Sequence, residues 1–332
     1  MPHRITLIPG DGIGPEVAQA TKEVLAATGV SLVWDEHDAG LAAIEKTGDA
    51  LPDETIESCK TKGVALKGPT TTPVGGGHTS ANVRLRRELD LYASVRPTKT
   101  IPGVDTPYKD VDLVVFRENT EGLYSGLENR VADGVVLSIK VVTAQATDRI
   151  AKAAFEYAVK NGRKSVTAVH KANIMKLGDG LFLERVKRIA AEYPQIEYQE
   201  VIIDALCMRL VREPQKFDVL LMENLYGDIV SDLCSGLVGG LGVVPGSNIG
   251  EDTAVFEAVH GSAPDIAGKG VANPLGLIKS AVLMLEHIGE LSASERLANA
   301  IDEAMVSGEA LTADLGGTAN TADVAAAIIK RL

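Results

Sequence analysis

At the start of the chain, segments with the pattern of a β-strand alternate with a segment that has the periodicity of an α-helix. This alternation constrains the fold more than any other feature. The apolar run at residues 5–8 predicts a strand, and the loop at residues 9–14 is rich in glycine. Residues 15–28 open with proline and are typical of an amphipathic helix, and residues 31–35 predict a second strand. A strand, a helix and a strand in succession indicate parallel strands, so we expect an α/β protein with helices on the faces of its sheet.

The glycine loop differs from a dinucleotide-binding fingerprint. Its glycines follow the spacing GxGxG before a proline, whereas the Rossmann pattern requires GxGxxG and an acidic residue about twenty positions further on. We therefore expect these glycines to serve a turn with positive φ and close backbone packing.

Length and composition fit a chain of two closely packed domains. The 332 residues are enough for two full cores, and a hydrophobic content of 45% is typical of a soluble globular protein. Aromatic residues make up only 4%, and the 33 glycines favour an α/β protein over a β-sandwich or a membrane protein.

The formal charge of −12 argues against nucleic acid or an anionic membrane surface as a partner. A small anionic substrate is compatible with this charge only if arginines gather locally. Five arginines supply such a group: Arg84, Arg86, Arg87, Arg96 and Arg117.

The cysteines and the first residues bear on location. Cys59, Cys207 and Cys234 lack CxxC spacing, which indicates neither a zinc site nor a disulfide framework and fits a reducing compartment. The chain enters its first predicted strand without an apolar signal region or an Arg/Ser-rich transit segment, and no run approaches about 18 apolar residues. We expect a cytoplasmic protein without membrane contact.

Further elements follow from the same periodicities. Apolar runs predict strands at residues 64–69, 111–116, 135–142, 166–171 and 197–203, and periodic runs predict helices at residues 78–92, 146–161, 180–193, 274–289, 293–307 and 321–332. Lys171 and Asp204 come at the carboxyl ends of predicted strands, where open α/β sheets place their sites. The hydroxyl-rich loop at residues 70–77 either faces a ligand or is a plain surface loop.

Two carboxylates, Asp228 and Asp232, stand four residues apart just after the apolar run at residues 219–222. If Asp228 opens a helix, both side chains share one face, and with a third acid they would offer the hard oxygen ligands that Mg²⁺ or Mn²⁺ prefers. Alternatively, Asp228 merely caps the helix and Asp232 is a solvated acid in its first turn.

Five long motifs resemble those of the β-hydroxyacid oxidative decarboxylases, the family of isocitrate, 3-isopropylmalate and homoisocitrate dehydrogenases. They are GDGIGPE at residues 10–16, RENTEG at 117–122, HKANIM at 170–175, NLYGDIVSD at 224–232 and HGSAPDIAG at 260–268. The resemblance covers essentially the whole chain, which is most similar to the NAD-dependent isocitrate dehydrogenases.

This resemblance implies an unusual α/β fold without a Rossmann domain. A large domain would be built from residues 1–98 and 238–332, and residues 99–237 would form an inserted small domain. A clasp near residues 123–140 would join two copies in a homodimer. The implied activity is the NAD-dependent, Mg²⁺- or Mn²⁺-dependent oxidative decarboxylation of isocitrate to 2-oxoglutarate and CO₂.

The resemblance also implies roles for single residues. Arg86, Arg96 and Arg117 match the clamps for the substrate carboxylates, whereas Arg84 and Arg87 do not match and are interpreted as structural or solvated charges. The implied metal ligands are Asp228, Asp232 and, from the partner chain, Asp204. Lys171 of the partner chain would lower the pKa of the C2 hydroxyl and relay its proton, and Tyr124 would protonate C3 of the enolate.

Ser80 and Asn82 match the positions where isocitrate dehydrogenases hydrogen-bond the third carboxylate, and the isopropylmalate branch has apolar residues there. Ser80 is equally compatible with a helix N-cap. Two other functions stay open: homoisocitrate dehydrogenase, and a non-catalytic regulatory subunit of a hetero-oligomer.

The cofactor is expected to be NAD. NADP-dependent relatives place Lys-Tyr where this chain has Asp265 and Ile266, and a Tyr and an Arg where it has Ala313 and Gly317. An Asp can accept hydrogen bonds from the ribose hydroxyls and repels a 2′-phosphate. The residues expected to hold the adenosine are His260, Gly261, Ser262, Ala263 and Asn273, and Thr71 is expected on the nicotinamide side.

Overall fold

The computed structural model describes residues 2–71 and 80–332 and groups them into two compact units. The first unit comprises Met1–Leu91, Thr100–Pro107 and Val238–Leu332, and the second comprises Tyr92–Lys99 and Tyr108–Leu237. This division differs from the predicted domains at residues 92–98, which group with the second unit because their strand pairs with the strand Asp112–Glu118. It also differs at residues 100–107, which group with the first unit.

The sheet of the first unit runs in the order β2-β1-β3-β12-β11. Its strands are β1 (His3–Ile8), β2 (Leu32–Glu36), β3 (Val64–Lys67), β11 (Pro245–Ile249) and β12 (Ala254–Ala258). All pairings are parallel except that of β11 with β12. The parallel pairing of β1 and β2 across the helix α1 (Gly14–Ala27) confirms the strand–helix–strand unit predicted from the first residues.

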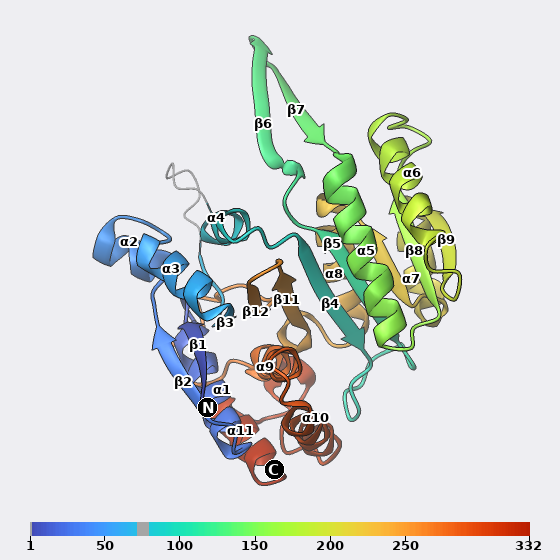
Figure 1. Ribbon diagram of the computed structural model, residues 1–332. Helices are drawn as coiled ribbons and strands as arrows, with labels where there is room; N and C mark the ends of the chain where they lie inside the picture. The colour runs from blue at the N-terminus through green and yellow to red at the C-terminus, as the bar shows by residue number, and fades with distance from the viewer. Residues whose placement is uncertain (1, 72–79) are drawn as a thin grey trace. The chain divides into compact units, whose positions relative to one another are not determined.

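Helices cover both faces of this sheet (Figure 1). Besides α1, the helices of this unit are α2 (Leu41–Thr47), α3 (Asp53–Lys62), α4 (Ala81–Glu88), α9 (Leu275–His287), α10 (Leu291–Val306) and α11 (Thr321–Ile329). Because side chains alternate along a strand, Ala65 and Val255 enter the buried cluster beneath α3 and α4. The next residue of β12, Phe256, points to the other face, where its ring lies 5.4 Å from that of His287 on α9.

The sheet of the second unit runs in the order β4-β5-β10-β8-β9. Its strands are β4 (Ala93–Lys99), β5 (Asp112–Glu118), β8 (Ser165–His170), β9 (Glu197–Ile202) and β10 (Val219–Met222), and its helices are α5 (Ala144–Lys160), α6 (Gly178–Ala190), α7 (Ile203–Arg212) and α8 (Asn224–Leu237). Only the pairing of β4 with β5 is antiparallel. The strands β8 and β10 are buried along their full length, which explains why they read as continuous apolar runs.

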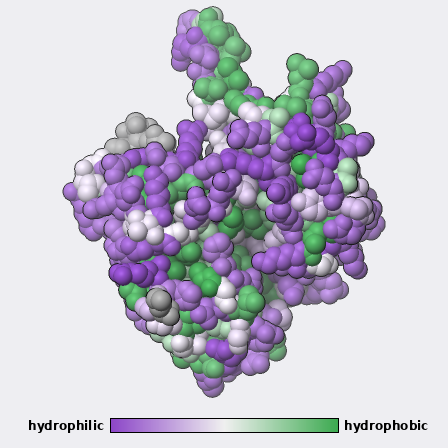
Figure 2. Space-filling view, in the orientation of Figure 1, coloured by the Kyte–Doolittle hydropathy of each residue, from purple (hydrophilic) through white to green (hydrophobic). Residues whose placement is uncertain are grey.

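An antiparallel hairpin of β6 (Gly122–Ala132) and β7 (Val135–Val141) projects from the second unit (Figure 1). Apolar side chains on it are exposed, and Figure 2 shows apolar surface at its tip. They are Leu127, Val131, Val135, Val136, Leu137 and Ile139.

Several elements lie where none was predicted, among them α2, α3, α7, β4 and β11. The helix of residues 224–237 also begins four residues before Asp228, so the interpretation of Asp228 as a helix cap is wrong. Most of the loop expected at residues 70–77 lies outside the described residues. Within the residues described, no helix is both long and apolar enough to cross a membrane.

Candidate active site

The helix α8 starts directly behind the buried strand β10, with Asn224 as its first residue. Asp228 and Asp232 are therefore one turn apart inside a regular helix and share a face. Their side chains are 37% and 54% exposed, so both carboxylates can be reached by a ligand.

Arg117 lies at the end of β5 with only 1% of its surface exposed. Its Nε and Nη2 donate hydrogen bonds of 3.0 and 2.7 Å to Oδ1 of Asn224, and its Nη1 forms an ion pair with Oδ1 of Asp228. The backbone of Gly227 makes this position possible, because a Cβ there would lie 2.4 Å from Cγ of Arg117. The first turn of α8 is thus built around the guanidinium of Arg117.

Tyr124, on β6, reaches the same carboxylate from another side. Its hydroxyl donates a 2.5 Å hydrogen bond to Oδ2 of Asp228, and the guanidinium of Arg117 lies 5.0 Å from the ring centroid. Burial, followed by the neighbouring Asp228, raises the pKa of Tyr124, and Arg117 offsets part of this effect. The phenol therefore keeps its proton at neutral pH.

Arg96, on β4, is 6% exposed and approaches α8 one turn further on. Its Nη1 donates a 2.7 Å hydrogen bond to Oγ of Ser231 and lies 3.5 Å from Oδ1 of Asp232. Burial raises the pKa of Asp232 and nearby Asp228 adds to this, although Arg96 and Arg117 act in the opposite direction. Negative charge at Asp232 is therefore only partly compensated.

The carboxylates of Asp228 and Asp232 fit a hard divalent cation. They offer oxygen ligands one turn apart, and the raised pKa of Asp232 reflects chiefly burial, which disfavours its charged form and which a bound cation would offset. Among the described residues no three acidic, histidine or cysteine side chains come together as a metal site. The third predicted ligand, Asp204, thus does not join the other two within one chain.

Asp204 instead pairs with Lys171. Asp204 lies in the first turn of α7, and its Oδ1 accepts a hydrogen bond from Nζ of Lys171, which follows β8. The bond to Lys171 lowers the pKa of Asp204. The side chain of Lys171 is 27% exposed and that of Asp204 is 70% exposed, so this pair faces solvent.

In the first unit, Arg86 belongs to a buried polar network. Its Nη2 lies 3.2 Å from Oε1 of Glu257, whose carboxylate also pairs with Nζ of Lys67 at 2.8 Å and accepts a 2.7 Å hydrogen bond from Asn248. Burial alone would raise the pKa of Glu257, but Lys67 and Arg86 hold that pKa far below its usual range. The network fixes one edge of the Arg86 guanidinium.

Ser80 and Asn82 lie at the start of α4. Ser80 occupies the N-cap position, but its side chain makes no capping hydrogen bond. Oδ1 of Asn82 accepts a 2.9 Å hydrogen bond from Oγ1 of Thr70. Arg84 was interpreted from the sequence as a structural or solvated charge. Its Nη1 lies 2.8 Å from each of the two carboxylate oxygens of Asp49.

The residues expected around the cofactor also lie in the first unit. Oγ1 of Thr71 is 2.5 Å from Oγ of Ser262, and the neighbouring Ala263 adopts a φ of +39°. Burial lowers the pKa of His260, so its ring is neutral, and its buried Nε2 makes no hydrogen bond. Oδ1 of Asn273 accepts a 3.0 Å hydrogen bond from the backbone N–H of Leu275, the first residue of α9.

The two positions proposed to select the cofactor are accessible. Asp265 is exposed and Ile266 is half-buried. Gly317 differs, because a Cβ there would lie 2.0 Å from the carbonyl oxygen of Leu311. This backbone excludes any larger side chain at position 317.

Sequence reasoning missed the residues that hold the arginines. Asn224 and Gly227 stand inside a motif already singled out, and Lys67 is a lysine that ends an apolar strand, which is itself a signal of a buried charge. Ser231 also stands inside that motif, whereas Glu257 gave no such signal, because its partner Arg86 is distant in sequence.

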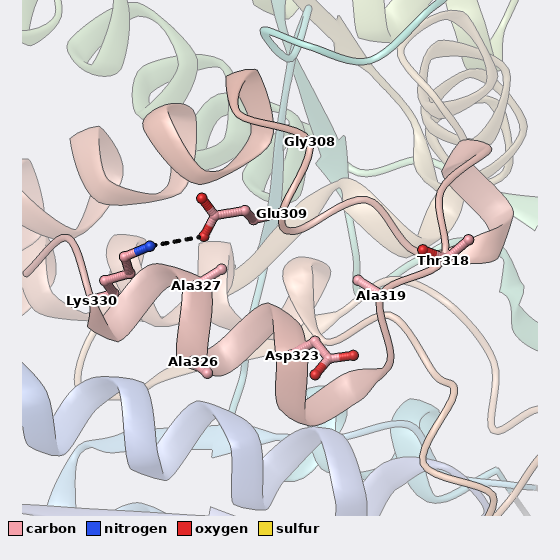
Figure 3. A pocket seen from close by; sticks show the side chains of 8 residues that line it. All are labelled: Gly308, Glu309, Thr318, Ala319, Asp323, Ala326, Ala327 and Lys330. Carbon is pink, nitrogen blue, oxygen red and sulfur yellow. Dashed lines mark hydrogen bonds and ion pairs between the residues drawn. The ribbon is translucent and has the colours of Figure 1, made fainter.

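A separate cavity of about 410 Å³ lies against α11 (Figure 3). The ion pair of Glu309 and Lys330 crosses one side of it, and Asp323 lines the other. None of its lining residues was predicted to belong to the active site.

Known proteins resemble this chain over nearly its whole length. The family model described as isocitrate/isopropylmalate dehydrogenase matches residues 4–328. The chain is 53% identical over 332 residues to the mitochondrial isocitrate dehydrogenase [NAD] catalytic subunit 5 of Arabidopsis thaliana, covering 100% of this chain and 89% of that protein. It is 52% identical over 307 residues to the chloroplastic 3-isopropylmalate dehydrogenase of Solanum tuberosum, covering 92% and 86% respectively.

The structure is similar to a solved one. The crystal structure of isocitrate dehydrogenase from Methylococcus capsulatus superposes with a TM-score of 0.96 at 52% sequence identity, over 99% of each chain.

Proposed function

The chain belongs to the isocitrate/isopropylmalate dehydrogenase family and has its fold, and we propose that it catalyses the NAD-dependent oxidative decarboxylation of isocitrate to 2-oxoglutarate and CO₂. The observation that carries this proposal is the convergence of Arg117 and Tyr124 on Asp228. This reaction needs a carboxylate that can bind a cation, an arginine that can bind a substrate carboxylate and a protonated phenol, and these three groups are in contact here.

Arginines would bind the substrate carboxylates. Arg96 and Arg117 are buried and are held by Ser231 and Asn224, so their forks are oriented before the substrate arrives. Arg86, held by Glu257, is the third proposed clamp. This preorganisation lowers the entropy that binding would otherwise cost.

Asp228 and Asp232, with Asp204 of the partner chain, are the residues that would hold Mg²⁺ or Mn²⁺. Such a cation, when bound, supplies Lewis-acid polarisation at the C2 oxygen and the adjacent carboxylate. Because both carboxylates are accessible, we expect activity to disappear after chelator treatment and to return when Mg²⁺ or Mn²⁺ is added back.

Lys171 and Tyr124 would move the protons. Lys171 of the partner chain would place its ammonium beside the C2 hydroxyl, lower the pKa of that hydroxyl and relay its proton, with Asp204 fixing the direction of the ammonium. Tyr124 would then protonate C3 after CO₂ has left. The raised pKa of Tyr124 supports a role as a proton donor.

We propose that the chain works as a homodimer, with the hairpin of β6 and β7 as the clasp. A two-stranded hairpin is marginally stable alone in water, and this one exposes a row of apolar side chains along both strands. The exposure of Lys171 and Asp204 leaves them available to a neighbouring chain.

NAD is the proposed cofactor, and isocitrate the proposed substrate. The exposed carboxylate of Asp265 favours a cofactor without a 2′-phosphate, and the polar pair of Ser80 and Asn82 favours a third carboxylate over an isopropyl group. The proposed location is the cytoplasm, which fractionation of the source cells would test.

A steady-state panel tests the function. Purified, metal-supplemented protein should use isocitrate with a higher kcat/KM than homoisocitrate or 3-isopropylmalate, and NAD with a higher kcat/KM than NADP. The similarity to a chloroplastic 3-isopropylmalate dehydrogenase makes that substrate the informative competitor. Preference for 3-isopropylmalate or homoisocitrate would refute the assignment of substrate.

A further inference from the structure

The carboxylate of Asp11, in the glycine loop after β1, is only 6% exposed and accepts three backbone hydrogen bonds. Two come from Leu41 and Ala42 at the start of α2, each at 3.0 Å, and the third comes from Thr71 at 2.7 Å. We propose that Asp11 is a positioning residue for NAD, because it fixes the backbone of Thr71 beside Ser262. This inference rests on the proposed NAD-binding function.

The loop that carries Asp11 is held between the two segments expected at the cofactor. The backbone N–H of Asp11 donates a 2.7 Å bond to the carbonyl oxygen of Pro69, and that of Ile13 donates a 2.9 Å bond to the carbonyl oxygen of Ser262. Gly12 adopts a φ of +59°, and a Cβ there would lie 2.0 Å from the Ser262 oxygen. The predicted use of these glycines, close packing in a turn with positive φ, is confirmed for Gly10 and Gly12, and the backbone they approach belongs to Pro69 and Ser262.

Thr71 and Ser262 join these segments. Their hydroxyl oxygens are 2.5 Å apart, although 191 residues separate them in sequence. The position of the Thr71 hydroxyl depends on the backbone of Thr71, and Asp11 holds that backbone through its N–H. Asp11 therefore acts on the hydroxyl pair without touching it.

A carboxylate is required at position 11, because three N–H groups point at it. Oδ2 accepts from both Leu41 and Thr71, while Oδ1 accepts from Ala42. An amide with its oxygen in the place of Oδ2 would still accept from Leu41 and Thr71 and would oppose only Ala42. We therefore choose Asp11→Ala, which removes all three acceptor contacts and releases Thr71.

Kinetics of Asp11→Ala test the proposal. The KM for NAD and the Kd for NADH, measured by fluorescence titration, should rise roughly tenfold or more, because a small displacement of a positioning group is amplified in binding. The KM for isocitrate should change less than the KM for NAD. Asp38→Ala is the matched control: Asp38 pairs with Lys46 at the surface, and its loss should leave both constants unchanged.

Two further variants separate the contacts of Asp11. Ala42→Pro removes the N–H that bonds to Oδ1 and keeps the Thr71 contact, so the NADH Kd should stay within about twofold of the wild type. Gly40→Ala should reproduce the loss of NADH affinity without altering the carboxylate, because a Cβ at Gly40 would lie 2.0 Å from Oδ2 of Asp11. If Asp11→Ala does not fold, Gly40→Ala carries the test.

Certain results would overturn the inference. If Asp11→Ala lowers the melting temperature but leaves the NADH Kd unchanged, Asp11 only stabilises the fold. If Ala42→Pro weakens NADH binding as much as Asp11→Ala, the effect passes through α2 and not through Thr71. Failure of the proposed function is distinguishable, because it would appear in the wild type, as an absence of NADH binding or of isocitrate oxidation.

Discussion

The hydroxyl of Tyr124 donates a 2.5 Å hydrogen bond to Oδ2 of Asp228 while Arg117 holds the other oxygen of the same carboxylate. One carboxylate thereby orients both a proposed proton donor and a proposed substrate clamp. The guanidinium also lies 5.0 Å from the centre of the tyrosine ring, so the three side chains form one packed cluster. A change in any of them should affect catalysis more than stability.

Tyr124→Phe removes the proposed donor of the C3 proton but keeps the ring that packs on Arg117. We expect kcat to fall by about 10²–10⁴ with little change in the KM for isocitrate. The exchange of the C3 hydrogens of 2-oxoglutarate with deuterium from solvent, followed by NMR, should be lost in parallel. Tyr193→Phe, in a tyrosine that stacks on Phe155, is the control. Exchange at the wild-type rate in Tyr124→Phe would assign the protonation to another group.

Gly227→Ala tests whether the close approach of the α8 backbone is needed to position the side chain of Arg117. A Cβ at this position would lie 2.4 and 2.5 Å from Cγ and Cβ of Arg117, so the arginine or the helix must shift. We expect kcat/KM for isocitrate to fall about tenfold or more. In the same helix, Gly236→Ala meets no atom within 4 Å and should stabilise the protein by about 0.5–1 kcal/mol without affecting activity. Equal activities of the two variants would contradict the assigned role of Gly227.

The sequence was sufficient for elements whose evidence is local. The strands β8 and β10 are continuous apolar runs, and the first strand–helix–strand unit is set by periodicity and turn residues. The helix α2 escaped prediction because its N-terminal N–H groups are satisfied by Asp11, which lies about 30 residues earlier in the chain. A hydrogen bond between residues so far apart in sequence leaves no local sequence pattern.

In the active site, too, the predicted residues are those with local evidence in the sequence, and the missed residues are those whose partners are distant. The acids Asp228 and Asp232 were visible because their spacing matches one turn of a helix. The partners of the arginines were not visible, since Asn224 lies 107 residues from Arg117 and Ser231 lies 135 residues from Arg96. Only the fold shows that these side chains are in contact.

Glu223 provides a test of pH dependence. It is 6% exposed, its carboxylate pairs with Lys140, and burial raises its pKa from 4.5 to about 7, with Asp179 and Glu121 adding to the rise and Lys140 opposing it. Its pKa is higher in the folded than in the unfolded state, so the folded state binds more protons between these values. The contribution of protonated Glu223 to the free energy of unfolding is therefore complete below pH 4.5 and is lost as the pH rises through about 7.

Glu223→Gln should therefore flatten the decline in melting temperature between pH 5 and pH 8 by roughly 3 °C or more. Differential scanning calorimetry of both proteins across this range makes the measurement. Glu128→Gln serves as the control, because Glu128 is an exposed carboxylate on the hairpin whose contact is with Ser138. Identical pH profiles for the wild type and Glu223→Gln would rule out the raised pKa.

Replacement of Asp265 and Ile266 by Lys and Tyr should shift cofactor use toward NADP. The new cation would attract the 2′-phosphate that Asp265 repels, so the ratio of kcat/KM for NADP to that for NAD should rise about tenfold or more. Addition of Gly317→Arg should not help, because a Cβ at Gly317 would lie 2.0 Å from the Leu311 carbonyl oxygen. Asp302→Lys, an equal change of charge on the exposed face of α10, is the control. An unchanged ratio in the double variant would remove the argument for Asp265.

Hybrid dimers test whether each site takes residues from two chains. A dimer of one Lys171→Ala chain and one Tyr124→Phe chain would contain one site with both wild-type residues and one site with neither, if Lys171 acts in the neighbouring site. Two inactive parents would then yield a heterodimer with about half of the wild-type activity. If Lys171 and Tyr124 instead act within one chain, every site in the heterodimer lacks one residue, and activity should stay at the level of the parents. Two affinity tags purify the heterodimer, so an inactive preparation of confirmed composition would refute the shared site.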